Sequence, residues 1–482
     1  MIRFLINNDV VELNEARADL TLLQFIREHR KKTGTKEGCA AGDCGACTVV
    51  LVEPASSNSA AELNYRTVNS CITLMSAVHG KQLLFVEHLN DGKHLHPVQQ
   101  ALVDHHGSQC GFCTPGFIMS MFALYHSNTK PNRDDVLHAL SGNLCRCTGY
   151  RPIIDATMEV CEQTPDDQFT ARQAATLSTL LSLSGEKPTG TGNIHTPTSR
   201  EELKTLIQAH PTAQLVAGST DLSLQFTQQL KDVETLISVT HIDALKQCTK
   251  SEHSLILGAA VPLNDAAPLL LNAFPQVAEL VTRFASLPIR NQATIGGNVA
   301  NASPIGDMPP LLLALNAILH LDNGESVRMI PISTFFTGYR ETMLAKDEWI
   351  SAIEIPLKQP NQALAAYKIS KRFEDDISAV CAVFNVTLDN GKVEAISSGF
   401  GGVAAVPSTC NALENVLKGK QFASNECLTL GKQVLFDAFS PIDDVRATAQ
   451  YRKTVLANLW HRFWLENQTA NQIETRVVQC VS

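Results

Sequence analysis

Four cysteines near the N-terminus constrain the fold of this chain more than any other feature. They are Cys39, Cys44, Cys47 and Cys71. The first three have the spacing C-x4-C-x2-C, which is typical of a plant-type [2Fe-2S] cluster. The same loop contains Gly38, Gly42 and Gly45, and a loop wrapped around an inorganic core needs unusual backbone angles and close approach of its amides. The spacing predicts a [2Fe-2S] cluster, with structural zinc or buried free thiols as alternatives.

A second group of four cysteines follows. They are Cys110, Cys113, Cys145 and Cys147, and they form the pairs C-x2-C and C-x-C. Each pair precedes a proline, Pro115 or Pro152, that opens a segment with helical spacing of apolar residues. Helix N-termini favour the negative charge of a thiolate-ligated cluster because they carry free amides and a partial positive charge. A C-x-C pair is unusual for zinc, so this group predicts a second [2Fe-2S] cluster.

The composition excludes several classes of protein. The chain has 482 residues, which is about three domains at roughly 150 residues each. Its 39 basic and 48 acidic residues give a net charge of −9, so no global positive field attracts nucleic acid or an anionic membrane. The N-terminus has no basic region followed by an apolar one, and the longest apolar stretch, at 311–321, is too short to span a bilayer. We therefore expect a cytoplasmic protein, in which clustered cysteines bind metal rather than form disulfides.

The expected fold class is multidomain α+β. Alternating apolar residues predict a hairpin near residues 2–13, a helix at 21–30 and strands near 48–52 and 65–68, so residues 1–85 form a small β-rich domain. Four short helical patterns predict that residues 86–161 form an all-helical domain. Residues 162–196 are rich in Thr, Ser, Gln and Gly and are expected to be a linker. Residues 197–372 mix helices and strands, beginning with a capping box at Ser199. Residues 373–482 contain a hairpin at 380–399 and a long helix at 445–465, and form a C-terminal α+β domain.

Two glycine-rich segments mark the middle of the chain. One is Leu215-Val-Ala-Gly-Ser-Thr-Asp-Leu222, and the other is Thr294-Ile-Gly-Gly-Asn298, which precedes Asp307. Their glycines would let backbone amides approach a pyrophosphate, and Ser219, Thr220 and Asn298 could add side-chain hydrogen bonds. The sequence lacks the G-x-G-x-x-G pattern of a Rossmann dinucleotide site. Taken alone, these segments are ordinary turns more often than phosphate sites.

The two cysteine groups in this order, followed by the glycine-rich segments, resemble the small iron-sulfur and flavin subunits of bacterial xanthine dehydrogenases, within the molybdenum hydroxylase family. The resemblance covers essentially the whole chain. It implies a β-grasp ferredoxin-like [2Fe-2S] domain at 1–85 and a four-helix [2Fe-2S] domain at 86–161. It also implies a two-subdomain α/β FAD-binding domain at 197–372 and a C-terminal flavoprotein domain at 373–482.

The resemblance also implies the residues of the binding sites. Gln109 and Cys147 would approach a molybdopterin held by a partner subunit, and Asp375 would lie nearest the flavin ring. The motif Lys371-Arg372-Phe373-Glu374 departs from that of some relatives, which have two arginines directly before the acidic run. The implied FAD contacts are Leu215, Val216, Ala217, Gly218, Ser219, Thr220, Asp221, Leu222, Phe284, Thr294, Ile295, Gly296, Gly297, Asn298, Asp307, Ile350 and Lys368.

The function that this resemblance implies is electron transfer within an NAD-dependent xanthine dehydrogenase. Electrons would pass from the molybdenum site of a larger partner subunit through two [2Fe-2S] clusters to FAD and then to NAD, and the complex would be a dimer of heterodimers acting on hypoxanthine and xanthine. No residue of this chain would catalyse hydroxylation. One alternative is the equivalent subunit of a relative that oxidises aldehydes or other N-heterocycles. The other is a zinc-stabilised binding protein without enzymatic activity.

Overall fold

The computed structural model describes residues 1–55, 62–90, 92–127, 130–188, 192–373 and 375–468, together with Ile473 and Thr475. The chain forms two compact units. The N-terminal unit comprises residues 1–243, 262–264 and 286–294, and the C-terminal unit comprises residues 244–261, 265–285 and 295–482. No helix of the described residues is long and apolar enough to cross a membrane.

The N-terminal unit begins with a five-stranded sheet. Its strands are β1 (Ile2–Ile6), β2 (Asp9–Leu13), β3 (Thr48–Pro54), β4 (Leu63–Asn69) and β5 (Gln82–Leu84), in the order β2-β1-β5-β3-β4. The expected hairpin is present, because β1 and β2 pair antiparallel. The helix expected at 21–30 is α1 (Leu22–Gln24), capped by Thr21, and it continues as one π-helical turn over Phe25–His29.

Four helices follow the sheet, as the sequence predicts. They are α2 (Pro97–Asp104), α3 (Thr114–Tyr125), α4 (Arg133–Leu140) and α5 (Arg151–Val160). Prolines stand in the first turns of α2, α3 and α5, where the missing N–H has no intrahelical partner. Phe117 and Phe122 of α3 are buried in a core that also contains Val50 and Val52 of β3. The helical domain therefore packs directly on the sheet.

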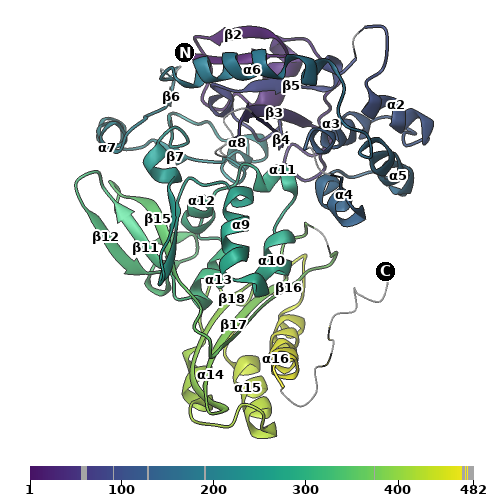
Figure 1. Cartoon of the computed structure of the whole chain (residues 1–482). Helices are drawn as coiled ribbons and strands as arrows, with labels where there is room; N and C mark the ends of the chain where they lie inside the picture. The colour runs from purple at the N-terminus through teal and green to yellow at the C-terminus, as the bar shows by residue number, and fades with distance from the viewer. Residues whose placement is uncertain are drawn as a thin grey trace. The chain divides into compact units, whose positions relative to one another are not determined.

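The segment at 162–196, expected to be a linker, instead contains a 17-residue helix. Helix α6 spans Gln168–Ser184, and its Leu180 and Leu183 pack on Leu5 of β1. Figure 1 shows α6 lying along the N-terminal sheet. This helix could not be recognised from the sequence, because it is rich in Thr, Ser and Gln and only a few apolar residues along it face the sheet. Residues 189–191 of the expected linker lie outside the described part of the chain.

The remainder of the N-terminal unit is a small parallel sheet with its helices. Strands β6 (Ile194–His195), β8 (Leu236–Ser238) and β7 (Gln214–Val216) pair in that order. Helix α7 (Arg200–Ala209) starts at the predicted cap, because the Ser199 side chain accepts from the Glu202 amide. Helix α8 (Leu224–Thr227) follows β7, and α11 (Leu287–Arg290) lies in the returning segment 286–294.

The C-terminal unit contains an antiparallel five-stranded sheet in the order β12-β11-β15-β10-β9. These strands are β9 (Cys248–Lys250), β10 (Ser254–Gly258), β11 (Ile318–Asp322), β12 (Val327–Pro331) and β15 (Trp349–Pro356). A short pair, β13 (Phe336–Gly338) and β14 (Glu341–Thr342), lies between β12 and β15 in the sequence. The helices that accompany this region are α9 (Leu263–Ala273), α10 (Ala278–Thr282), α12 (Ile295–Ala300) and α13 (Met308–Ala314).

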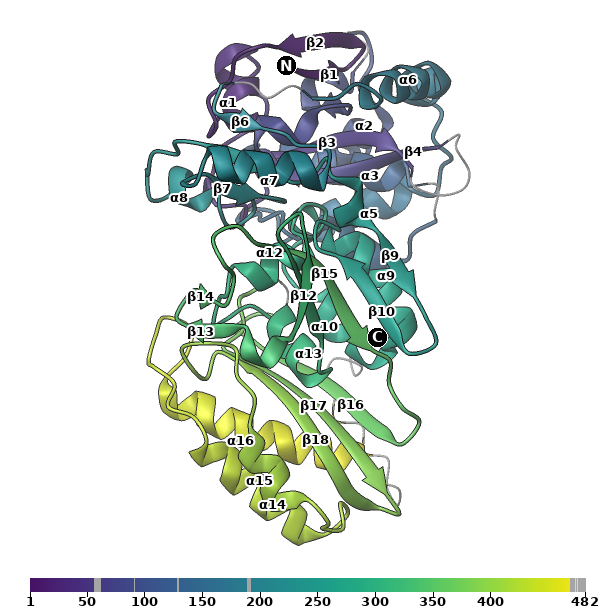
Figure 2. The ribbon, with the colours of Figure 1, turned by 90° about the vertical axis from the view of Figure 1, so that its left-hand side faces the viewer.

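A second sheet of the C-terminal unit carries the last part of the chain. Its strands β16 (Gln362–Ile369), β17 (Val380–Asp389) and β18 (Lys392–Gly401) pair antiparallel, and β17 and β18 form the predicted hairpin. Because β16 is hydrogen-bonded to β17 along its length, this sheet begins near residue 362 rather than after the expected boundary at 372. Helices α14 (Asn411–Leu417), α15 (Asn425–Asp437) and α16 (Ala449–Glu466) cover one face of it (Figure 2).

Arg452 anchors α16 beside this sheet. Its side chain is 2% exposed, and its guanidinium donates to the carbonyls of Ala379 and Gly402 at 2.7 Å each. It also forms an ion pair with Asp444 at 2.5 Å. Three acceptors therefore depend on one buried cation.

We expect Arg452→Met to destabilise the C-terminal unit by about 3 kcal/mol, because removing one partner of a buried ion pair leaves the others desolvated and unpaired. Urea unfolding followed by circular dichroism measures the change. The matched control is Arg446→Met. The Arg446 guanidinium is 3.9 Å from the same Asp444 carboxylate, farther than that of Arg452, and its side chain is more exposed. Its loss should therefore cost less than about 1 kcal/mol. Equal effects of the two changes would contradict the anchoring role.

Candidate functional site: two cysteine clusters and a flavin-type loop set

The structure brings together the four cysteines of the first group. The Sγ atoms of Cys47 and Cys71 are 3.3 Å apart, and the Cys39 thiol shares hydrogen bonds with Cys44 and Cys71. Cys47 and Cys71 are buried, whereas Cys39 and Cys44 are partly exposed. Four thiols in close pairs match the ligand requirement of a two-iron core.

The loop that carries these thiols is shaped to hold anionic sulfur. The backbone amides of Ala41, Asp43 and Cys44 each donate to the Cys39 Sγ at 3.4 Å. Hydrogen bonds from Cys44 and Cys71, together with backbone amides, lower the pKa of the Cys39 thiol although burial opposes this. A Cβ at Gly38 would lie 2.8 Å from the Cys44 Sγ. This loop therefore fits a thiolate-ligated [2Fe-2S] cluster.

The second cysteine group also forms two facing pairs. Cys113 shares a hydrogen bond with Cys145, and Cys147 shares one with Cys110. Burial raises the pKa of the Cys145 thiol, but hydrogen bonds from Thr148 and from the Cys147 amide outweigh it and lower that pKa. Cys113 is the N-cap residue of α3, as the proline after this pair predicts. The group therefore fits a second cluster, at an exposed part of the helical domain, because Cys110 and Cys147 are exposed.

A direct hydrogen bond connects the two cysteine loops. The Leu144 amide, next to Cys145, donates to the Cys44 carbonyl at 3.0 Å. The buried Asn143 amide group donates to the Gly45 carbonyl at 3.1 Å and to the Thr48 hydroxyl at 3.2 Å. A Cβ at Gly45 would lie 2.3 Å from the Gly142 carbonyl oxygen. The two predicted clusters are thus held by loops in backbone contact.

The first glycine-rich segment, residues 215–222, lies in the N-terminal unit with Thr294. Gly218 is in close backbone contact, since a Cβ there would lie 1.9 Å from the Gln292 carbonyl oxygen. Ser219 has a φ of +59°, and its buried hydroxyl donates to the Ile72 carbonyl at 2.8 Å. This hydroxyl, predicted to bind FAD, therefore contacts the residue that follows Cys71 and keeps only its acceptor capacity for another partner.

The other predicted FAD residues lie in the C-terminal unit. They are Phe284, Ile295, Gly296, Gly297, Asn298, Asp307, Ile350 and Lys368. The Asn298 Oδ1 atom is buried without a hydrogen-bond partner among the described residues, and such an atom requires a donor from a bound molecule or water. Gly296 is in close contact with the Ala259 backbone, because a Cβ would lie 2.6 Å from its oxygen. These features fit a bound cofactor with hydrogen-bond donors, such as FAD.

Asp307 and Lys368 form a buried ion pair rather than two separate contacts. Their charged atoms are 2.5 Å apart, and the side chains are 4% and 2% exposed. The Ser378 hydroxyl donates to the other oxygen of Asp307 at 2.6 Å. Each residue can therefore present only its remaining hydrogen-bonding capacity to a ligand.

The charged loop after β16 is held by a residue that the sequence analysis missed. The Arg283 guanidinium lies 4.2 Å from the centroid of the Phe373 ring and donates to the carbonyls of Phe373 and Lys368 at 2.8 and 2.9 Å. Asp375, predicted to lie near the flavin ring, has a φ of +50°. Glu374 of the predicted motif lies outside the described residues. Arg283 could have been suspected only from its place beside Phe284.

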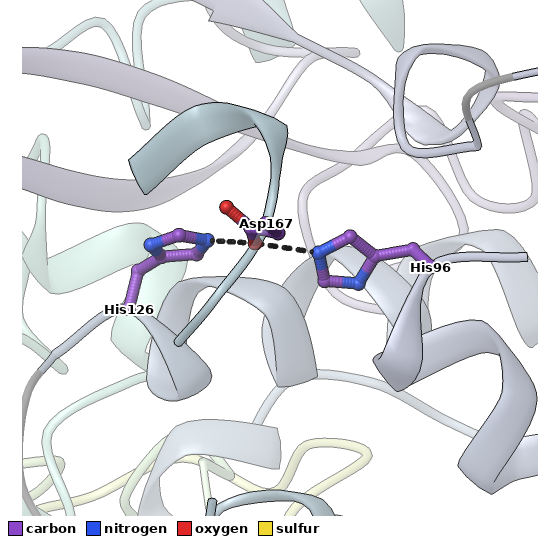
Figure 3. Close-up of side chains that lie close together, drawn as sticks. All are labelled: His96, His126 and Asp167. Atoms are coloured by element: carbon purple, nitrogen blue, oxygen red, sulfur yellow. Dashed lines mark hydrogen bonds and ion pairs between the residues drawn. The ribbon is translucent and has the colours of Figure 1, made fainter. Parts of the chain in front are cut away.

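A further cluster of potential ligands lies in the N-terminal unit, formed by His96, His126 and Asp167. One ligand atom from each lies within 4.8 Å of the others. Figure 3 shows the two imidazole rings on opposite sides of the carboxylate, with an Nε2 atom of each directed at it. The distances to the Asp167 Oδ2 are 2.8 Å from His96 and 2.9 Å from His126. No signal in the sequence joins these three residues, because His126 and Asp167 are 30 and 71 residues from His96.

Hydrogen bonds to the Asp167 carboxylate account for this cluster, which we call the Asp167 clamp. The Val98 amide donates to the His96 Nδ1, so in the neutral ring the proton is on Nε2. An ionised carboxylate can only accept, so both Nε2 atoms donate to it in the hydrogen bonds that the structure shows. The Asp167 Oδ1 accepts from the amides of Phe169 and Thr170 at 2.9 Å each. One carboxylate thus joins the ends of α2, α3 and α6.

Four family models match consecutive parts of the chain. They are a 2Fe-2S iron-sulfur cluster binding domain at residues 5–76 and a [2Fe-2S] binding domain at 85–158. An FAD binding domain in molybdopterin dehydrogenase follows at 189–358, and a CO dehydrogenase flavoprotein C-terminal domain at 365–467. The chain therefore carries two [2Fe-2S]-binding domains and an FAD-binding domain, as the sequence analysis predicts.

The chain is also similar to curated xanthine dehydrogenases. It is 32% identical to that of Emericella nidulans over an alignment of 538 positions that covers 98% of this chain and 39% of the relative. It is 34% identical to that of Drosophila pseudoobscura over 465 residues, covering 83% of this chain and 34% of the relative. It is 30% identical to the xanthine dehydrogenase/oxidase of Mus musculus, covering 96% of this chain and 38% of the relative. The chain thus spans little more than a third of these relatives.

Two solved structures match part of the chain. Carbon monoxide dehydrogenase from Hydrogenophaga pseudoflava matches with a TM-score of 0.54 and 25% identity, over 57% of this chain and 96% of that one. Quinoline 2-oxidoreductase from Pseudomonas putida 86 matches with a TM-score of 0.53 and 20% identity, over 60% of this chain and 100% of that one. At this identity the match supports a shared fold and nothing further. Together the comparisons show that the chain is similar to part of xanthine dehydrogenases and, over about half its length, to a chain of carbon monoxide dehydrogenase.

We expect two independent [2Fe-2S] sites. Cys44→Ser should remove one cluster signal and leave the other, and Cys113→Ser should do the reverse, because each thiol belongs to a separate ligand set and exposure and hydrogen bonding tune each cluster differently. Electron paramagnetic resonance of the reduced protein measures both signals. Cys161→Ser is the matched control, since this buried thiol belongs to neither set. Loss of both signals from one folded variant would refute two independent sites.

We expect Asp167→Ala to destabilise the N-terminal unit by about 3 kcal/mol at neutral pH, because four donors lose their acceptor, and each buried unpaired group costs about 1–3 kcal/mol. Burial alone raises the pKa of Asp167, but hydrogen bonds from His126 and His96 hold it well below its usual range. The folded pKa is thus below the unfolded value of about 3.9, so the stabilisation is present above that pH and is lost as the pH falls below it.

The measurement for the Asp167 prediction is urea unfolding at a series of pH values, with Asp166→Ala as the control because Asp166 is exposed. The difference in free energy of unfolding between wild type and Asp167→Ala should become smaller below about pH 4. The content of bound metal should be the same in both proteins. A metal ion lost specifically from the Asp167 variant, with both cluster signals intact, would show that the clamp account is wrong.

Proposed function

We propose that this chain is the electron-transfer component of a xanthine dehydrogenase, carrying electrons from the molybdenum site of a partner subunit to FAD and then to NAD. The order of carriers would be the helical-domain cluster, the first cluster and FAD. The observation that carries the proposal is the hydrogen bond from the Leu144 amide to the Cys44 carbonyl, because it joins the loops of the two ligand sets. Two adjacent one-electron carriers suit a relay rather than two separate structural metal sites.

The partner subunit would dock where the second cysteine group reaches the surface. Gln109, Cys110 and Cys147 are exposed there. Phe112 and Leu144, which flank ligands of the same group, are 48% and 44% exposed. Exposed apolar residues beside a cofactor are typical of a surface that a partner covers. Gln109 and Cys147 would then approach the partner's molybdopterin, in a complex that is a dimer of heterodimers.

The flavin would be the point where single electrons are combined into a pair, since FAD accepts single electrons and donates hydride. The chain's own residues position it. The unpaired Asn298 Oδ1 would accept a hydrogen bond from it, and the glycine-rich segments would let the backbone approach its pyrophosphate. Asp375 would set the charge near the ring, where a negative group disfavours an anionic reduced flavin and leaves hydride transfer to NAD available.

The substrate would be hypoxanthine or xanthine, which the partner subunit would convert to urate. This part of the proposal depends on the similarity to xanthine dehydrogenases over nearly the whole chain. A second candidate is the corresponding component of an enzyme with another substrate. It is favoured by the match to carbon monoxide dehydrogenase, of which 96% is covered.

Reconstitution tests the proposal. The isolated chain should be brown, contain two [2Fe-2S] clusters and FAD, and lack hydroxylase activity. Added to the molybdopterin-binding partner, it should support xanthine oxidation that is faster with NAD than with oxygen as the acceptor. Equal or faster turnover with oxygen would remove the dehydrogenase assignment. A colourless chain that binds stoichiometric zinc, or purine oxidation by the isolated chain, would overturn the electron-transfer function itself.

A further inference from the structure

The carbonyl group of Ile72 accepts two buried serine hydroxyl groups. Ser219 and Ser223 each donate to the Ile72 oxygen at 2.8 Å. A carbonyl oxygen has two lone pairs, so both are satisfied here by side chains from a segment 147 and 151 residues further along the chain. Ser223 is completely buried, and Ser219 is 8% exposed.

The Ile72 carbonyl lies next to a predicted cluster ligand in the sequence. Ile72 directly follows Cys71, the last ligand of the first cysteine group. Ser219 belongs to the glycine-rich segment 215–222, and Ser223 follows that segment directly. A short path of covalent bonds and one hydrogen bond therefore runs from a cluster ligand to the predicted flavin segment.

Other contacts hold the same two loops together. Leu224 of α8 and Ile289 of α11 pack against the apolar cluster formed by Leu23, Cys47, Cys71 and Ile72. The Gln228 amide group donates to the carbonyls of Cys39 and Ala40 at 2.9 and 3.0 Å. Residues 219–228 thus contact both ends of the ligand set, around Cys39 and around Cys71.

The packing around Ile72 leaves little freedom for this arrangement. A Cβ at Gly42 would lie 2.5 Å from the Ile72 Cδ1 and 3.1 Å from the Ile289 Cδ1. The Thr73 hydroxyl is bonded to the Gln292 side chain at 2.9 Å, so the residue after Ile72 is also tied to the returning segment. Apolar cover on one side and fixed hydrogen bonds on the other exclude water from Cys47 and Cys71, which are both 2% exposed.

We propose that Ser219 and Ser223 are positioning residues for electron transfer between the first cluster and the flavin, acting through the Ile72 carbonyl. The inference deepens the proposed function and depends on it. The two hydroxyls fix the Cys71 loop against the flavin-binding segment and direct the positive ends of two O–H dipoles towards it. Dipoles of this orientation stabilise the more negative, reduced cluster, because hydrogen bonds and burial tune cluster potentials.

The step that these residues serve moves one electron and no atoms. The first cluster would supply the flavin with one electron at a time, so two such transfers would be needed to reduce the flavin fully. Neither serine gains or loses a proton. Their effect is on distance and on the local field alone.

The test uses the full chain with its cofactors and compares Ser223→Ala, Ser219→Ala and the double variant. We expect the double variant to show a more negative reduction potential for the first cluster and an altered resonance signal, while the second cluster is unchanged. Electron delivery to the flavin should be at least about tenfold slower, because displacement of reacting groups by about 1 Å can cost about 100-fold in rate. Ser223→Ala should give part of the effect with full flavin content.

Ser238→Ala is the matched control, because Ser238 is 2% exposed in β8 of the same unit and its hydroxyl pairs with Thr240 at 2.9 Å instead of a cysteine loop. It should leave both cluster potentials unchanged. Unchanged potential and transfer rate in Ser223→Ala and in the double variant, with both clusters and flavin bound, would overturn the inference and leave the proposed function standing. Wild-type chain without clusters or flavin would instead overturn the proposed function.

Discussion

The buried side chain of Asn143 is the interaction on which the arrangement of both cysteine groups depends. Its amide group donates to Gly45 and Thr48 on one side and accepts from Ser120 of α3 on the other. It thereby holds the loop of one ligand set against the loop of the other. A side chain on Gly116 would collide with this contact, since a Cβ there would lie 2.1 Å from the Gly45 oxygen. The relay that we propose between the two clusters depends on this close packing.

Local patterns in the sequence predicted much of the molecule. The cysteine spacings identified all eight thiols that the structure brings together, because ligands of one cluster come from short loops with fixed spacing. Prolines located three of the four helices of the second domain, and the capping box at Ser199 located the start of α7, since these signals act within one helical turn. The hairpin of β17 and β18 followed from Asn390-Gly391 at its turn.

Features that depend on contacts between distant segments could not be predicted in this way. Asp167 meets His96 and His126 only because three helix ends converge. Helix α6 was taken for a linker because its stability comes from packing on β1 rather than from its own composition. Ser219 illustrates the same point. The family resemblance implied a flavin contact for it, and nothing in the sequence indicated that its hydroxyl also bonds to the residue after a cluster ligand.

The central claim is that this chain holds two adjacent one-electron carriers that act in series. Electron paramagnetic resonance during a stepwise reduction of the purified chain tests it most directly. The account predicts two distinct [2Fe-2S] signals with different potentials, and broadening of both by spin coupling once the two clusters are reduced together, because their ligand loops are joined by the hydrogen bond from Leu144 to Cys44. One signal alone, or two signals that never influence each other, would contradict the account.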